Sequence, residues 1–272
     1  MKKEKKGLLQ TIFKGMFVGG TMLVPGVSGG SMAMILGIYD RLIKSVSNFV
    51  KNKKENFCFL GLFAIGGIIG MLLFAKPIDY LIEIFTKPML YFFIGAVVGG
   101  VPMIYKKANV QKVTMQVILY LAAGGIAVIL FAMIPVKDYM QADGVAGMLT
   151  LLIAGVVAAV ALVLPGISVS YMFLIMGVYD KVISAIKHFD ISVLLPLGLG
   201  GLIGIALTTK LLDMVLSRYP KASYMVILGF VLASAAEIFP GIPSGIEWVI
   251  CPAMFAIGYF AISLISSYGE EN

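Results

Sequence analysis

The sequence predicts an all-α polytopic membrane protein of two inverted repeats, each a re-entrant helical hairpin plus three transmembrane helices. Three observations predict this class: the composition, an internal repeat and the distribution of positive charge. The 272 residues are 60% hydrophobic and 13% charged, with a mean hydropathy of +1.00. Soluble domains are about 45–50% apolar and about 25% charged. The composition therefore predicts an integral membrane protein.

Eight apolar segments divide the chain. Two of them, 8–47 and 145–187, have about twice the length of a membrane span and are interrupted in the middle by Pro-Gly. The others are close to the roughly 20 residues that cross about 30 Å of hydrocarbon. These six predicted crossings are 57–75, 89–105, 115–135, 192–209, 223–239 and 247–267.

The two long segments repeat one another. The stretch LVPGVSGGSMAMILGIYD begins at residue 23, and VLPGISVSYMFLIMGVYD begins at residue 163. Aligning 15–49 with 155–189 at an offset of 140 gives 11 identities in 35 positions. Beyond the basic loop the offset becomes 134, which pairs Lys76 with Lys210 and Asp79 with Asp213. We therefore expect two copies of one unit, 1–137 and 138–272, each with a hairpin followed by three helices.

Lysine and arginine predict the orientation. If each long segment is a hairpin and the N-terminus is cytoplasmic, sixteen of the 21 Lys and Arg residues fall inside and five outside. If each long segment crosses once, the split is eleven against ten. The positive-inside rule favours the hairpins, which place both termini in the cytoplasm. Because three crossings are an odd number, the second repeat then starts on the opposite side, a plan that recurs among secondary transporters.

The interrupted tips suggest an anion site. Proline removes a backbone donor, and freed backbone groups at membrane depth are tolerated where protein buries them or where they line a polar cavity. Two serines are placed as N-caps, which would leave the amides of 29–31 and 169–171 free for an anion such as phosphate. The alternative is that the breaks are simple kinks and the small residues serve packing. The predicted substrate-binding residues of the tips are Gly26, Ser28, Gly29, Gly30, Ser31, Gly166, Ser168 and Ser170.

Charged pairs follow each tip at matching places, Asp40-Arg41 and Asp180-Lys181. They predict a gate or an entry site for an anionic head group, with Arg41 on the cytoplasmic face and Lys181 on the outer face. The alternative is an acid–base pair whose long side chains extend to the membrane interface. The tyrosines that precede them, Tyr39 and Tyr179, are interpreted as interface anchors.

Three further charged residues are candidates for gating or coupling. Lys76 and Lys210 form a symmetric set at opposite ends of the predicted spans. Glu237 either carries a coupling proton or is an ordinary surface acid. No cluster of His, Cys, Asp and Glu suggests a metal site, and no cofactor is predicted. The net charge of +7 does not indicate nucleic acid, because the basic residues lie in short runs between apolar segments.

The doubled motif resembles the polyprenyl-phosphate transporter family called PopT. The resemblance rests on PGVSGGSMAMILGIYDRLI and its looser copy PGISVSYMFLIMGVYDKVI, and it covers nearly the whole chain. It implies a multi-pass protein of the bacterial plasma membrane, with inverted repeats and re-entrant hairpins. It also implies a flippase that returns undecaprenyl phosphate, or a related polyprenyl phosphate, from the outer to the inner leaflet, so that the carrier lipid is recycled for cell wall biogenesis.

Two other functions stay open at this point. A membrane enzyme acting on a lipid phosphate would need a base beside Ser28 or Ser168, and no histidine or carboxylate adjoins either in sequence. A transporter of a small soluble anion would need no lipid. The sequence also leaves open the driving gradient and a homo-oligomer, because GxxxG-like spacings serve internal packing as readily as subunit contacts.

Overall fold

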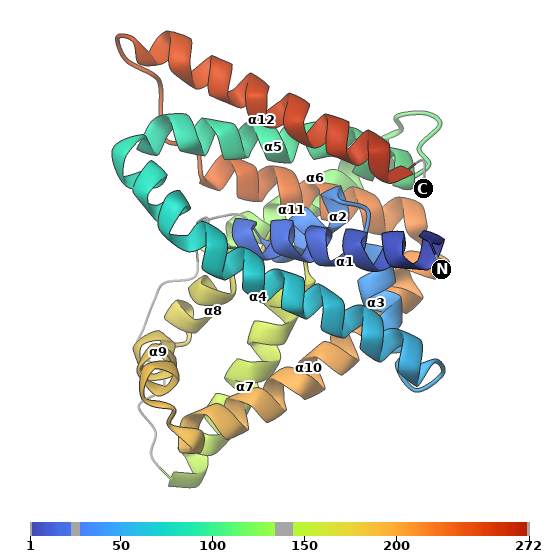
Figure 1. Cartoon of the computed structure of the whole chain (residues 1–272), viewed down its shortest axis with the longest axis vertical. Helices are drawn as coiled ribbons and strands as arrows, with labels where there is room; N and C mark the ends of the chain where they lie inside the picture. The colour runs from blue at the N-terminus through green and yellow to red at the C-terminus, as the bar shows by residue number, and fades with distance from the viewer. Residues whose placement is uncertain (1, 23–27, 134–143, 271–272) are drawn as a thin grey trace.

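The computed structural model describes residues 2–22, 28–133 and 144–270, which form helices and no strand (Figure 1). The predicted all-α class is therefore confirmed. The twelve helices in this part of the chain are α1 (Lys2–Thr21), α2 (Gly29–Ile35), α3 (Tyr39–Ser47), α4 (Lys53–Ile84), α5 (Thr86–Lys107), α6 (Met115–Ala132), α7 (Gly144–Val163), α8 (Val169–Ile175), α9 (Tyr179–His188), α10 (Ile191–Arg218), α11 (Pro220–Glu237) and α12 (Glu247–Glu270).

The exposed surface fits a protein that is embedded in lipid. Among the described residues, five helices are long and apolar enough to cross a membrane: α4, α5, α7, α10 and α12. Large apolar side chains on them face outward, with Leu72 76% exposed, Leu202 67% and Val249 72%. Soluble monomers rarely expose contiguous apolar surface of this kind. Of the other predicted crossings, α6 is a shorter apolar helix, and α11 is largely buried between its neighbours.

Helices pack in tight pairs through glycine. α1 lies along α4, and α7 lies along α10. At Gly66 of α4 a Cβ atom would lie 2.2 Å from the carbonyl oxygen of Ile12, and at Gly200 of α10 it would lie 2.0 Å from that of Leu152. Such contacts between backbones are possible only without a side chain, and small residues serve this purpose in membrane helices generally.

Two further pairs cross between the halves of the sequence. α5 packs along α12, which is the last helix of the chain, and α6 packs along α11. Figure 1 shows α5 and α12 running side by side at one edge of the molecule. Each half of the sequence therefore contributes a helix to a pair that the other half completes.

The repeated motif forms the same local structure twice. Ser28 and Ser168 are extended and cap α2 and α8, so their prediction as N-caps is confirmed. At the other end of these short helices, Gly37 and Gly177 have φ angles of +68° and +66°. The amide after each glycine donates five residues back, as Ile38 does to the carbonyl of Ala33, which is the Schellman arrangement that ends a helix. The chain bends by 118° between α8 and α9.

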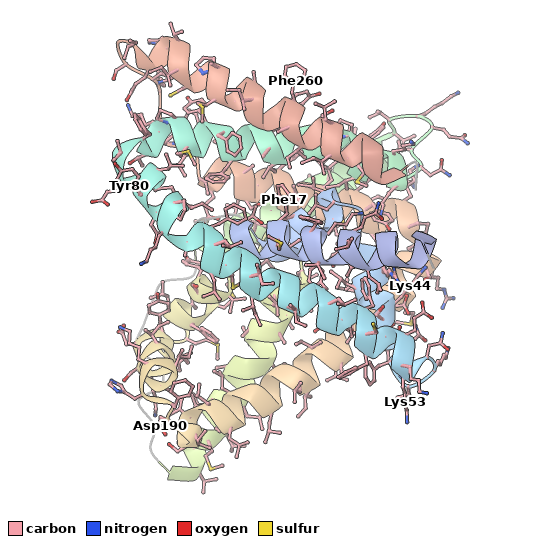
Figure 2. All side chains as sticks on the ribbon, in the orientation of Figure 1. Phe17, Lys44, Lys53, Tyr80, Asp190 and Phe260 are labelled. Atoms are coloured by element: carbon pink, nitrogen blue, oxygen red, sulfur yellow. The ribbon has the colours of Figure 1, made fainter. Side chains whose placement is uncertain are left out.

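The molecule has two distinct ends. α1 begins and α12 ends at the same one. Lys44 and Lys53 lie at this end, whereas Tyr80 and Asp190 lie at the other, where α4 meets α5 (Figure 2). The long helices run between these two ends.

Replacing Gly66 by valine is expected to lower stability by about 1–3 kcal/mol or more, because the new side chain overlaps the backbone of α1. Thermal unfolding of the purified protein in detergent measures the effect. Gly61→Val is the matched control, because it lies on the same helix and a Cβ there meets nothing within 4 Å. Equal unfolding temperatures for the two variants would contradict the proposed role of backbone contact between α1 and α4.

Candidate functional site

The hydroxyl group of Ser28 joins the two tips. The Ser28 Oγ accepts a hydrogen bond from the amide of Ser31, at 3.2 Å, and another from the amide of Gly166 in the second tip, at 3.0 Å. It also lies 3.3 Å from the Ser31 Oγ. In the second tip the Ser168 Oγ accepts from the amide of Tyr171, at 3.4 Å. The prediction that the amides of Ser31 and Tyr171 are free is therefore wrong, because each cap serine takes one of them.

A buried tyrosine also connects the halves. The Tyr39 hydroxyl donates to the carbonyl oxygen of Val163 at the end of α7, at 2.9 Å. Only 2% of Tyr39 is exposed. The interpretation of this residue as an interface anchor is therefore wrong, since its polar atom satisfies a backbone group beside the second tip.

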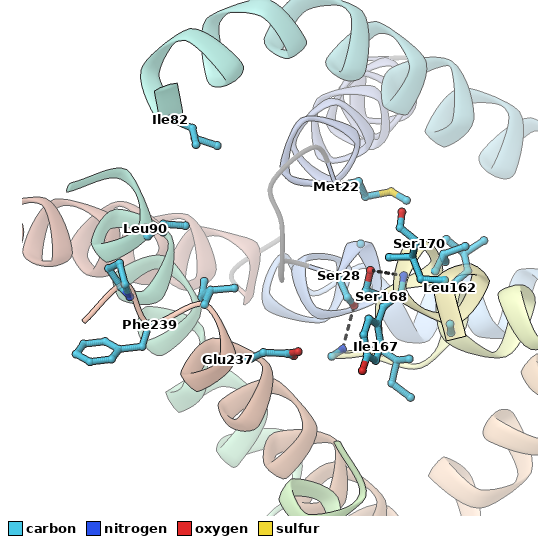
Figure 3. Close-up of a pocket in the computed structure, with 18 of the residues that line it drawn as sticks. Met22, Ser28, Ile82, Leu90, Leu162, Ile167, Ser168, Ser170, Glu237 and Phe239 are labelled. Carbon is cyan, nitrogen blue, oxygen red and sulfur yellow. Dashed lines mark hydrogen bonds between the residues drawn. The ribbon is translucent and has the colours of Figure 1, made fainter. Parts of the chain in front are cut away.

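A cavity of about 780 Å³ lies beside the tips (Figure 3). It reaches the end of the molecule at which α4 meets α5, through Ile82, Thr86 and Leu90. Six residues predicted for substrate binding or coupling line it together: Ser28, Gly29, Gly166, Ser168, Ser170 and Glu237. Much of the remaining wall is apolar and is formed by Met22, Leu162, Ile167, Leu174, Ile238 and Phe239.

The polar groups of the cavity are mostly neutral donors. Within the described part of the chain, Glu237 is the one charged side chain that lines it, and no lysine or arginine does so. The same part of the chain offers no hydrogen-bond partner to the amides of Val169 and Ser170, both of which line the cavity. The Ser168 and Ser170 side chains are exposed to it. These amides and hydroxyls can donate to an oxyanion.

Polar contacts hold together the opposite end of the molecule, which we call the closed end. The Asp40 carboxylate forms an ion pair with Lys107 at the end of α5 and accepts from the Tyr224 hydroxyl at 2.8 Å. The Asp213 carboxylate of α10 accepts from the Ser47 hydroxyl at 2.8 Å and from the Asn48 side-chain amide at 2.9 Å. Together these bonds hold α3 against α5, α10 and α11.

Comparison with known proteins identifies the family. The family described as undecaprenyl phosphate translocase-like matches residues 18–250, which is most of the chain. This protein belongs to that family. It is similar to the polyprenyl-phosphate transporter of Staphylococcus aureus, with 32% identity over 96% of this chain and 97% of the relative. It is also similar to the polyprenyl-phosphate transporter of Vibrio cholerae, with 30% identity over 85% of this chain and 78% of the relative.

The predicted resemblance to polyprenyl-phosphate transporters is therefore confirmed. The family and both relatives carry the names of transporters and not of enzymes. No solved structure shows a significant match.

Other residues predicted for the site of this translocase-like protein lie elsewhere. Gly26 lies outside the described residues. Gly30 and Ser31 are buried behind the wall of the cavity. Arg41 lies at the closed end, 3.9 Å from a carboxylate oxygen of Glu55 and with its guanidinium 4.2 Å from the centre of the Phe59 ring. The remaining members are exposed on the sides of α4, α9 and α10: Lys76, Asp180, Lys181 and Lys210.

The contacts of the closed end were missed at the sequence level. Lys107 is 67 residues from Asp40, and Tyr224 is 184 residues from it. No local spacing links these positions. The available signal for this contact was Lys107 itself, a basic residue at the end of α5. The positive-inside rule uses such a residue only to orient the chain.

Ser28→Ala is expected to destabilise the protein by about 1–3 kcal/mol, since two amides lose their shared acceptor near the centre of the molecule. Thermal unfolding in detergent measures this loss. Ser168→Ala is the matched control and should cost less, because its hydroxyl is exposed and accepts from one amide at the longer distance of 3.4 Å. A control variant that unfolds at the same temperature as Ser28→Ala, or at a lower one, would refute the bridging role.

Proposed function

We propose that this protein moves undecaprenyl phosphate, or a close polyprenyl phosphate, from the outer to the inner leaflet of the bacterial plasma membrane. The single observation that carries the proposal is the cavity beside the two tips, because it combines bare donors with a largely apolar wall. The names of the family and of both relatives agree with this substrate class.

The phosphate group is proposed to bind at the second tip. There the amides of Val169 and Ser170 and the hydroxyls of Ser168 and Ser170 can surround an oxyanion. Hydrogen bonds to a charged oxygen are about twice as strong as those between neutral groups. α8 has only seven residues, so we assign the binding to these individual donors and not to a long helix dipole.

The polyprenyl tail is proposed to stay in the bilayer. The apolar side chains that line the cavity, among them Met22, Leu90 and Leu174, offer the tail a surface as the head group enters. A phosphate head group that carries negative charge cannot cross hydrocarbon unaided, whereas the apolar tail of the lipid is soluble in it. The protein therefore needs to shelter only the phosphate.

The direction of loading follows from the proposed orientation. We place the end with Lys44 and Lys53 in the cytoplasm, as the positive-inside rule favours. The cavity then opens to the outer side, and the polar contacts of Asp40 and Asp213 close the inner side. The two halves are proposed to be inverted repeats with re-entrant hairpins that exchange access between the two sides.

Charged residues near each face are proposed to guide the head group. Arg41 lies at the proposed cytoplasmic end and Lys181 on α9 near the outer end, where each can attract a phosphate before entry or after release. Asp40 and Asp180 accompany them, and Lys76 and Lys210 lie farther along α4 and α10 as proposed gating residues.

Glu237 is proposed to couple transport to a proton. Its carboxylate lines the same cavity as the proposed phosphate site, and no cation among the described lining residues offsets it. Two anions in one cavity repel each other, so a proton carried on the Glu237 carboxylate would reduce this repulsion while the phosphate passes.

Reconstitution in liposomes tests the function. Undecaprenyl phosphate is placed in both leaflets, and a membrane-impermeant phosphatase reports the fraction that is accessible from outside. Without protein about half of the lipid should react, and with protein nearly all of it should react. No increase in accessible lipid under any imposed gradient would contradict the proposal. Inorganic phosphate released by the protein alone would indicate an enzyme, and uptake of soluble phosphate would indicate a small-anion transporter.

Glu237→Gln is expected to remove the response of transport to an imposed proton gradient, because a glutamine side chain cannot carry a proton. Initial rates in liposomes with and without the gradient measure this. Glu83→Gln is the control, because Glu83 is exposed near the same end but does not line the cavity. An equal response to the gradient in Glu237→Gln and wild type would exclude the coupling role.

A further inference from the structure

The two ends of the molecule pack differently, although the sequence repeat pairs them residue by residue. At the closed end α3 packs against α10, and Ser47 and Asn48 donate to the Asp213 carboxylate. The offset of 140 makes Lys187 and His188 the counterparts of Ser47 and Asn48. The offset of 134 makes Asp79 the counterpart of Asp213.

These counterparts do not meet. Lys187, His188 and Asp79 are all exposed, and within the described part of the chain none of their side chains makes a hydrogen bond or an ion pair. α9 packs on α8 and α10 but has no packing on α4 comparable to that of α3 on α10. Figure 2 shows Tyr80, which follows Asp79, and Asp190, two residues beyond His188, well apart at the end where α4 meets α5, which we call the open end.

Asp79, Lys187 and His188 have the chemical groups that a contact like the one at Asp213 requires. Lysine and histidine both donate N–H groups, so each can replace the donors of the closed end at a carboxylate. Lysine adds a positive charge, which makes this pairing stronger than its counterpart. The acid nearest to them in sequence is Asp190, whose Oδ1 already accepts from the amide and the hydroxyl of Ser192, at 3.0 and 2.6 Å. These bonds hold the pKa of Asp190 below its usual value.

The other polar contact of the closed end has no counterpart. Asp180 corresponds to Asp40, but the positions that correspond to its partners Tyr224 and Lys107 are Leu90 and Gly241. Neither offers a side-chain donor. Of the two polar contacts that hold the inner end, only the one centred on Asp79 can therefore form at the outer end.

We infer that Asp79, Lys187 and His188 close the outer end when α9 packs onto α4. Asp79 then accepts from Lys187 and His188, and the cavity is separated from the outer side while the contacts at Asp40 and Asp213 release. This inference rests on the alternating access of the proposed function and adds the residues that hold its second state.

Cysteine cross-linking of the full chain in liposomes tests the inference. The test pair is Asp79→Cys with His188→Cys, and the control pair is Asn48→Cys with Asp213→Cys, both in a background of Cys58→Ser and Cys251→Ser. The control pair should cross-link because its side chains touch in the structure. We expect the test pair to cross-link as well, to stop lipid movement when linked, and to regain movement on reduction.

A test pair that never links, in protein that moves lipid and whose control pair links, would overturn the inference while the proposed function survives. Cross-linking of both pairs in a protein that never moves lipid would support the inference and refute the function. A charge exchange provides an independent check in protein without engineered cysteines. Asp79→Lys should slow transport several-fold, and adding Lys187→Asp should restore it. Failure of this restoration would count against the pairing.

Discussion

The helix interruptions at the two tips depend on hydrogen-bond partners for the backbone polar groups that they free. An interrupted helix in apolar surroundings frees amides and carbonyls, and each one left alone costs several kcal/mol. Ser28 resolves this problem for both tips with one oxygen, which accepts from its own helix and from Gly166 of the other tip. Tyr39 satisfies the carbonyl of Val163 close by. Within the described part of the chain, the amides of Val169 and Ser170 have no such partner, and both residues line the cavity.

The rest of the protein consists of tightly packed helix pairs, with one loosely packed boundary between α9 and α4. Four helix pairs meet at backbone distance through glycine, where a change of a single methyl group has no space. Packed surfaces of this kind move as units, since they are not continuously deformable. The boundary between α9 and α4 lacks such contact. Movement of α9 relative to α4 therefore costs the least free energy, and these helices lie at the end where the cavity reaches the surface.

The sequence predicted those features that depend on nearby residues. A serine before a short apolar helix predicts a cap, and the apolar lengths predict the helices, because both are local effects. The repeat also led to one hypothesis for the residues of both tips, and five of these residues line one cavity. The ion pair of Asp40 with Lys107 and the burial of Tyr39 could not be predicted in this way. They depend on how helices of the two halves pack, and no spacing along the chain encodes that arrangement.

The assignment of free amides failed for a related reason. The cap serines were recognised, but a cap consumes the third amide of the helix that it starts. The amides of Ser31 and Tyr171 are therefore not available to an anion, because the cap serines that mark the tips accept their hydrogen bonds. Counting the bonds that a cap makes for itself would have corrected the prediction from the sequence.

The pairing of α5 with α12 constrains how the chain matures during synthesis. The ribosome synthesises α5 long before α12. During this time the glycine-lined face of α5 lies in the membrane without the helix that packs against it. During that interval the insertion machinery or surrounding lipid has to occupy the face. The packing of α5 is thus postponed until α12 has been translated, and a truncation before α12 would also leave α5 without its packing partner.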